Sequence, residues 1–206
     1  MNGVVALSGL ELLSHPEELE NPAGKGWHGW PNRSITVEEA WFLYGLVRAL
    51  RPAIVVEGGS GYSTLAMAAG LADNGSGRLR SYETGADYAR LSRAMLKGYR
   101  LAGRRAVVNV SPTGSLAYDG PNPDLVFIDS SAESRAAEIA HWLAQPTFLA
   151  IHDAYLVRST PDWLAAIAAD VILDSPRGLW MRDHAEHRFT RGTIASTEEN
   201  ADDTQT

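Results

Sequence analysis

Five ionisable residues lie at the ends of predicted strands, and their types could do acid–base and ligand-binding chemistry. Glu57 and Asp129 each end an apolar run, Glu83 ends an alternating segment, and His152 and Asp153 directly follow another apolar run. A histidine beside an aspartate could act as a general base, because its unperturbed pKa lies near neutrality. A carboxylate at the end of a strand can accept hydrogen bonds from both hydroxyls of a ribose. These five residues are the first candidates for a functional site.

A glycine-rich turn follows the first of these acids. Four apolar residues precede Glu57, and Gly58, Gly59 and Gly61 follow it just before a helical pattern begins. Glycines past a buried strand let the backbone turn sharply and approach a ligand closely. The next helix directs free N–H groups at that turn. Glu83 lies 22 positions after Gly61 (83 − 61 = 22), close to the spacing of a ribose-binding acid.

The glycine spacing does not match the loops that bind phosphates. A dinucleotide fold has the pattern G-x-G-x-x-G, but the third glycine position here is Thr64, and the phosphate loop G-x-x-x-x-G-K-[ST] is absent. An NAD-type reductase of the short-chain class needs Tyr-x-x-x-Lys, and no tyrosine of this chain has a lysine four residues on. An NAD-type oxidoreductase and a non-catalytic nucleoside-binding or assembly protein remain the alternatives to a transferase.

Strands and helices that alternate along the chain must position these residues. This order predicts an α/β fold, Rossmann-like and doubly wound, with a mostly parallel seven-stranded sheet and helices on both faces. The carboxyl ends of parallel strands meet at one edge, so the five candidates should converge there. The expected strands are 53–57, 78–83, 106–110, 124–129, 147–151, 170–174 and an antiparallel 179–181, with 188–194 as an addition to that edge. The expected helices are 36–51, 63–72, 86–101, 130–144 and one that begins at Thr160.

Two helix starts carry capping-box patterns. Thr36 with Glu39 predicts one N-terminus, and Ser130 with Glu133 predicts another. Ahead of the first lies a segment rich in Gly and Pro, residues 1–35, which we interpret as an N-terminal extension whose tryptophans could form a lid. Residues 36–194 form the expected domain, and the polar residues 195–206 are an expected disordered tail.

Composition excludes several function classes. The net charge of −7 argues against a broad nucleic-acid-binding surface, and no apolar stretch approaches a membrane span. The absence of cysteine removes thiolate chemistry and disulfides. We therefore expect a cytoplasmic protein with a small-molecule partner, and the sequence leaves a homodimer open.

The ordered set of motifs resembles the class I S-adenosylmethionine (SAM)-dependent methyltransferases, near the small catechol-type O-methyltransferases. The resemblance covers residues 36–181 and is carried by the segments Val56–Ser63, Tyr82–Glu83, Leu125–Asp129 and Ile151–Asp153. It implies SAM as cofactor.

The resemblance also implies roles for single residues. Gly59 and Gly61 would bound the methionine end of the cofactor, Glu83 would take the ribose, and Asp129 would face the amino group. Glu57 and Ser63 complete the expected cofactor-binding set. A hydroxyl acceptor needs help to lose its proton, and we expect His152 to act as general base with Asp153 beside it.

Metal-dependent members of this group resemble the chain at Asp129 and Asp153. They have an Asn directly after the second acid, whereas this chain has Ala154. Two carboxylates with water could still hold a hard cation such as Mg²⁺. The sequence therefore leaves the metal open, with one ligand missing.

Overall fold

The structure is a computed structural model, and it describes residues 35–103, 105–153 and 180–182. These residues form one sheet in the order β3-β2-β1-β4-β5-β6. Five strands are parallel, and the sixth runs antiparallel to β5. The strands are β1 (Ile54–Gly58), β2 (Arg78–Glu83), β3 (Ala106–Val110), β4 (Leu125–Ile128), β5 (Phe148–Ile151) and β6 (Trp180–Arg182).

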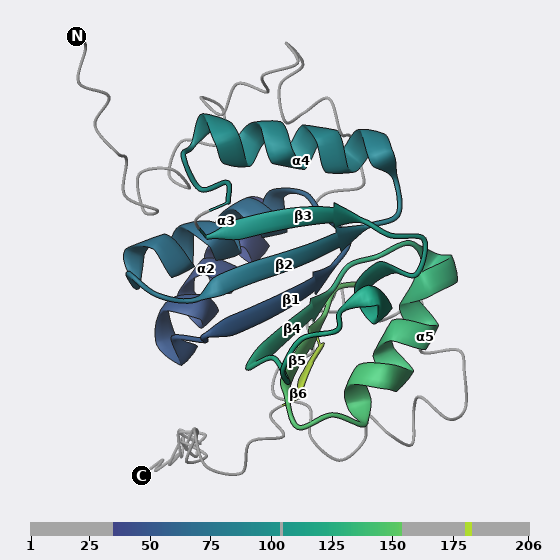
Figure 1. Ribbon diagram of the computed structural model, residues 1–206. Coiled ribbons are helices and arrows are strands. Elements are labelled where there is room, and N and C mark those ends of the chain that lie inside the picture. Colours follow the sequence, from purple (N-terminus) through teal and green to yellow (C-terminus); the bar gives the residue numbers. More distant parts are fainter. Residues whose placement is uncertain (1–34, 104, 154–179, 183–206) are drawn as a thin grey trace, which may run out of the picture.

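Helices cover both faces of this sheet, which confirms the doubly wound Rossmann-like fold (Figure 1). α2, α3 and α4 lie on one face, and α5 lies on the other with the short 3₁₀ turn η3. Their bounds are α2 (Val37–Leu50), α3 (Tyr62–Asp73), α4 (Ala86–Gly98), η3 (Gly114–Ala117) and α5 (Ala132–Leu143).

Each face buries its own apolar cluster, because successive side chains of a strand point to opposite faces. Val55 and Phe127 belong to the cluster under α2, α3 and α4, whereas Val56 and Val126 belong to the cluster with α5. All four side chains are fully buried. Strands buried on both faces read as continuous apolar runs, which is why the sequence located them well.

The described residues include six of the seven predicted strands. The predicted antiparallel strand at 179–181 is confirmed as β6, one residue further on. The predicted strands 170–174 and 188–194, the helix from Thr160, the lid within 1–34 and the tail 195–206 lie outside the described residues.

One of the two predicted capping boxes is correct. Thr36 Oγ1 accepts the Glu39 N–H over 3.2 Å, and Glu39 Oε2 accepts the Thr36 N–H over 2.7 Å. The box at Ser130 and Glu133 is wrong, since α5 begins after Ser131 without a side-chain cap. The Ser130 hydroxyl donates instead to Glu138, eight residues further along the chain in α5.

α4 ends earlier than predicted. Its last residue is Gly98, and Arg100 takes the left-handed conformation (φ 58°) that turns the chain toward β3. The N–H groups of Leu101 and Ala102 both donate to the carbonyl of Leu96, over 2.8 and 3.1 Å. These bonds satisfy a carbonyl at the helix end.

Within the described ranges, no helix has the length and apolar character that crossing a membrane would require.

Candidate functional site

The candidate site lies where the strand order reverses, at the carboxyl ends of β1 and β4. From β1 the chain continues outward to β2 and β3, and it then returns to place β4 on the other side of β1. The residues after the strands extend the ladder. Asp129 donates its N–H to Gly58 O over 2.7 Å, and His152 donates to Ile128 O over 2.9 Å. Ligands of open α/β sheets bind at such a reversal point.

The glycine bend fits closely against the end of β4. Gly59 has φ 90°, a conformation that residues with a side chain rarely adopt. A Cβ at this position would overlap the carbonyl oxygen of Asp129. The next turn begins α3, where the Gly61 N–H donates to Thr64 Oγ1 over 2.9 Å. Thr64 thus caps the helix at the position where a dinucleotide fold has its third glycine.

Glu83 faces this bend, as the sequence predicts. Its Oε2 accepts the Ser60 N–H over 2.9 Å and the Ser60 hydroxyl over 3.1 Å. Its Oε1 accepts the Gly85 N–H over 2.9 Å. The residue is 8% exposed. A carboxylate is therefore fixed beside the glycines. Its Oε2 already accepts two bonds from Ser60, so a ligand hydroxyl would approach Oε1, whose second contact is a long bond of 3.5 Å from Thr84 Oγ1.

Glu57 lies beneath the bend rather than at the open edge. It is fully buried, and its two carboxyl oxygens accept the hydroxyls of Ser63 and Thr64, each over 2.6 Å. Burial raises the pKa of Glu57 to about 7, although the hydrogen bonds from these hydroxyls act in the opposite direction. The geometry gives Glu57 and Ser63 a supporting position, and their predicted contact with a cofactor remains a prediction.

His152 lies among three carboxylates. Its Nδ1 is 3.1 Å from Asp129 Oδ1 and 3.5 Å from Asp153 Oδ2, and its Nε2 is 3.3 Å from Glu39 Oε1. Burial lowers the pKa of His152, but the hydrogen bonds to Asp129 and Glu39 and the nearby charges outweigh it and raise the pKa to about 10. At neutral pH the ring is an imidazolium that donates from both nitrogens.

Arg135 of α5 adds a second cation to this cluster. Its side chain is 5% exposed, and Nη2 donates to Asp129 Oδ1 over 3.1 Å. The other hydrogen bonds of the guanidinium go to backbone carbonyls. Nε and Nη2 donate to Ser130 O over 2.9 and 2.5 Å, and Nη1 donates to His152 O over 3.1 Å. Three carboxylates and two cations therefore meet at the ends of β4 and β5.

These residues fit a divalent ion poorly. Asp129, His152 and Asp153 each offer a ligand atom, and the atoms lie within 4.8 Å of one another. However, Arg135 already pairs with Asp129, and its backbone bonds hold it in place. His152 would have to give up a proton, against the pull of its carboxylates, before it could ligate. The predicted position of the missing ligand, Ala154, lies outside the described residues.

Sequence reasoning missed two members of this cluster. Glu39 was interpreted only as the third residue of a capping box, and in the structure its other oxygen faces His152. Arg135 lies within the predicted helix 130–144, and the sequence gave no sign of its role. Both act through partners that are distant in sequence or on another element. The sequence gave one hint that Glu39 could lie near the site: it belongs to the helix that directly precedes β1.

Asp153 is the most open acid of the cluster. Its side chain is 26% exposed, compared with 18% for Asp129 and 13% for Glu39. Its backbone has φ 51°, which is uncommon for a residue with a side chain and occurs often at functional sites. The structure thus brings together Asp129, His152 and Asp153, with Asp153 nearest to solvent.

Comparisons with known proteins give a consistent result at the level of the fold. No protein-family profile and no curated protein sequence matches the chain. Among solved structures, the chain is similar to the SAH-bound methyltransferase PaMTH1 of Podospora anserina, with 21% identity and a TM-score of 0.55 over 63% of this chain. The match covers 60% of that protein's own length, less than two thirds.

Two further structures match over more of their length. One is the O-methyltransferase TomG of Streptomyces achromogenes, involved in tomaymycin synthesis and solved with SAM: 19% identity, TM-score 0.57, 83% of this chain and 86% of that one. The other is an O-methyltransferase of Bacillus cereus solved with SAH. It is 20% identical, with a TM-score of 0.57, and the match covers 85% of this chain and 88% of that one. The chain therefore has the Rossmann-like α/β fold of the class I SAM-dependent O-methyltransferases.

Proposed function

We propose that this chain is a SAM-dependent O-methyltransferase that acts on a small-molecule acceptor. The fold supports this proposal, and so do the ligands of the similar structures, which were solved with SAM or with its product S-adenosylhomocysteine (SAH). Fold alone does not decide function, so the proposal depends on the chemistry of the site.

One observation carries the proposal: the carboxylate of Glu83 and the side chain of Thr64 already accept the N–H groups at the N-terminus of α3. The Ser60 N–H donates to Glu83, and the Gly61 N–H donates to Thr64. A dinucleotide would place its pyrophosphate against these same N–H groups. Here that anion would find the donors taken and a carboxylate beside them. A phosphate-free, positively charged nucleoside such as SAM meets no such repulsion.

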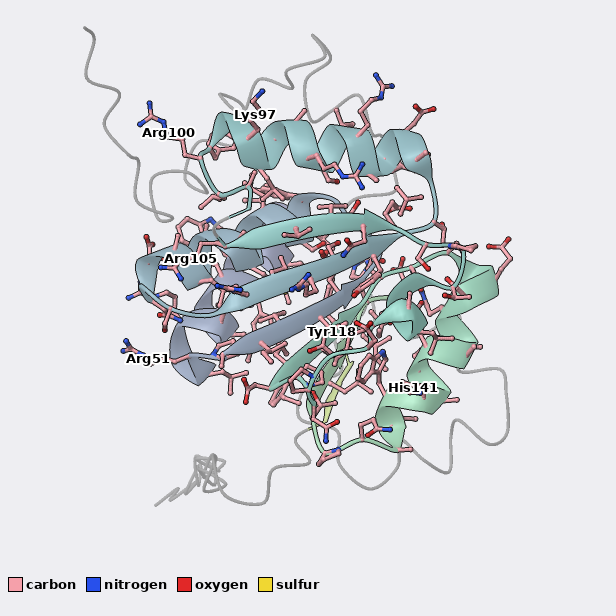
Figure 2. All side chains as sticks on the ribbon, in the orientation of Figure 1. Arg51, Lys97, Arg100, Arg105, Tyr118 and His141 are labelled. Atoms are coloured by element: carbon pink, nitrogen blue, oxygen red, sulfur yellow. The ribbon has the colours of Figure 1, made fainter. Side chains whose placement is uncertain are left out.

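The charge distribution favours the same ligand. The labelled cations Arg51, Lys97, Arg100 and Arg105 lie toward the amino ends of the strands (Figure 2). By contrast, Glu83, Asp129 and Asp153 stand at or just after the carboxyl ends of β2, β4 and β5. An edge that carries mainly carboxylates attracts a cationic ligand and repels an anionic one.

The residues divide the expected cofactor contacts among them. Glu83 binds the ribose hydroxyls, Gly59 and Gly61 leave room for the methionine end, and Asp129 faces the amino group. When bound, SAM supplies an electrophilic methyl group. The protein must hold the acceptor in line with that group and exclude water.

We propose that a group other than His152 removes the proton of the acceptor hydroxyl. The ring is already protonated at neutral pH, so the base role predicted from the sequence is open to it only after it loses a proton. We assign proton removal to the partly exposed carboxylate of Asp153, which could accept a hydrogen bond from the acceptor hydroxyl and take its proton. His152 holds Asp129 and Glu39 in place.

A methyl-transfer screen tests the function. The protein is incubated with SAM labelled in the methyl group and with phenols, sugars and carboxylic acids in turn, in the presence of Mg²⁺ or of EDTA. We expect label to enter a hydroxyl compound, and we expect EDTA to leave the rate unchanged because Arg135 pairs with Asp129. Transfer to none of these classes would remove the support for an O-methyltransferase, and loss of transfer in EDTA would show that a metal is used.

A further inference from the structure

Glu138 of α5 is a buried acid that the proposed function does not use. It is 0% exposed. Its Oε1 accepts the N–H of Ser115 over 2.5 Å, and its Oε2 accepts the Ser130 hydroxyl. Burying a carboxyl group costs free energy unless its oxygens accept hydrogen bonds. In some proteins such a buried group helps to specify a single conformation. The question is what this one holds in place.

The space around Glu138 is made by two glycines. A Cβ at Gly58, the last residue of β1, would overlap Glu138 Oε1, and a Cβ at Gly114, the first residue of η3, would do the same. The carboxyl group therefore fits between the end of β1 and the start of η3. Through Ser130 it also contacts the segment that follows β4. Three segments at the carboxyl edge thus meet at one side chain.

The turn that Glu138 holds begins directly beside Glu83. The Ser111 N–H donates to Glu83 O over 2.9 Å, so the chain leaves β3 next to the proposed ribose-binding acid. Three residues later η3 begins. A nucleoside whose sugar lies at Glu83 has the glycine bend on one side and η3 on the other. The methionine end is assigned to the glycines, so the base must face η3.

A second residue of α5 holds the same turn from one helical turn further on. Trp142 Nε1 donates to Ser115 Oγ over 2.9 Å. Tyr118, labelled in Figure 2, follows η3 and packs edge-on against Tyr82, with ring centroids 6.4 Å apart. Glu138 and Trp142 lie four residues apart on one face of the helix and bind the backbone and the side chain of Ser115 respectively.

We propose that Glu138 is a positioning residue for the cofactor's base: its carboxyl group fixes η3 at the distance from β1 that the base requires. This inference rests on the proposed function. The proposed role depends on the length of the Glu138 side chain and on its hydrogen bonds rather than on its charge, since both partners of Glu138 are neutral donors. Gln could replace it, because the amide oxygen can accept the Ser115 N–H and the amide N–H can donate to Ser130.

Two variants separate reach from charge. Glu138→Gln keeps the length of the side chain and removes its charge, whereas Glu138→Asp keeps the charge and withdraws the carboxyl group by about one C–C bond, ~1.5 Å. Glu133→Gln, on the exposed first turn of the same helix, is the matched control. The measurements are hydrogen exchange of the Ser115 amide without ligand, and calorimetric titration with SAH and with 5′-methylthioadenosine, which has the base and sugar but no amino-acid part.

We expect Glu138→Asp to weaken both ligands about tenfold and to speed exchange of the Ser115 amide by a similar factor, which corresponds to one lost hydrogen bond to a carboxylate. Glu138→Gln should stay within about threefold of the unmodified protein in both measurements. Normal affinities and slow exchange in Glu138→Asp would overturn the proposal, and so would equal losses in the two variants. Slow exchange of the Ser115 amide in a protein that binds no SAH would overturn the proposed function and the base-binding role. The contact by which Glu138 holds η3 would still be supported.

Discussion

Replacing Gly59 with alanine should abolish cofactor binding. The residue has φ 90°, and a Cβ there would overlap the carbonyl oxygen of Asp129. The backbone would have to shift, and the Ser60 N–H that Glu83 accepts would shift with it. We expect the affinity for SAH to fall at least about a hundredfold and the free energy of unfolding to fall by about 2–4 kcal/mol, measured by calorimetry and by urea denaturation.

Gly75→Ala provides the matched control for this prediction. Gly75 also has a positive φ, 72°, but no atom lies within 4 Å of a Cβ added there. The variant therefore carries the backbone strain without the overlap, and its free energy of unfolding should fall by only about 1 kcal/mol with normal SAH affinity. Equal behaviour of the two variants would contradict a specific fit of Gly59 against the end of β4.

Raising the pH should destabilise the fold as His152 loses its proton. The pKa is near 6.5 in the unfolded chain and about 10 in the fold, where Glu39, Asp129 and Asp153 surround the ring and Arg135 is the opposing cation. The folded pKa is the higher one, so this stabilisation is fully present below pH 6.5 and is lost as the pH rises through 10. Each pKa unit corresponds to about 1.4 kcal/mol, so the free energy of unfolding should fall by a few kcal/mol.

His152→Gln isolates this contribution. Gln cannot carry the charge, so the variant should be less stable at pH 7 by about 3–5 kcal/mol, and the difference from the unmodified protein should shrink toward pH 10. Urea denaturation across this range measures the difference, and NMR of the His152 ring measures the pKa directly. A ring that titrates near 6.5 would refute the imidazolium and would return the general-base role to His152.

The sequence predicted the parts of the site that follow from strand ends. Glu83 faces the Gly59–Gly61 bend, and Asp129, His152 and Asp153 meet at one edge, because a parallel sheet brings its carboxyl ends together. Such residues can be placed from strand order alone. The described strands were located by apolar runs and, for β2, by alternation, to within one residue at each end.

What the sequence could not show are contacts from the covering helices. Glu39, Arg135 and Glu138 all reach the edge from α2 or α5, and their partners lie as far as 113 residues away along the chain. The failed capping box at Ser130 has the same cause: its hydroxyl had a stronger partner in Glu138 than in the helix terminus. The pKa of His152 depends on these same carboxylates, which the sequence does not place beside it.

The most direct test is a calorimetric titration of the full chain with SAM, SAH and NADH, repeated with Glu83→Ala and with the exposed control Asp87→Asn. We expect SAM and SAH to bind the unmodified protein and NADH not to bind. Because Glu83 is the assigned ribose ligand, alanine there should weaken SAH by about tenfold to a hundredfold, while Asp87→Asn leaves it unchanged. Binding of NADH in preference to SAM, or full SAH affinity in Glu83→Ala, would contradict the site described here.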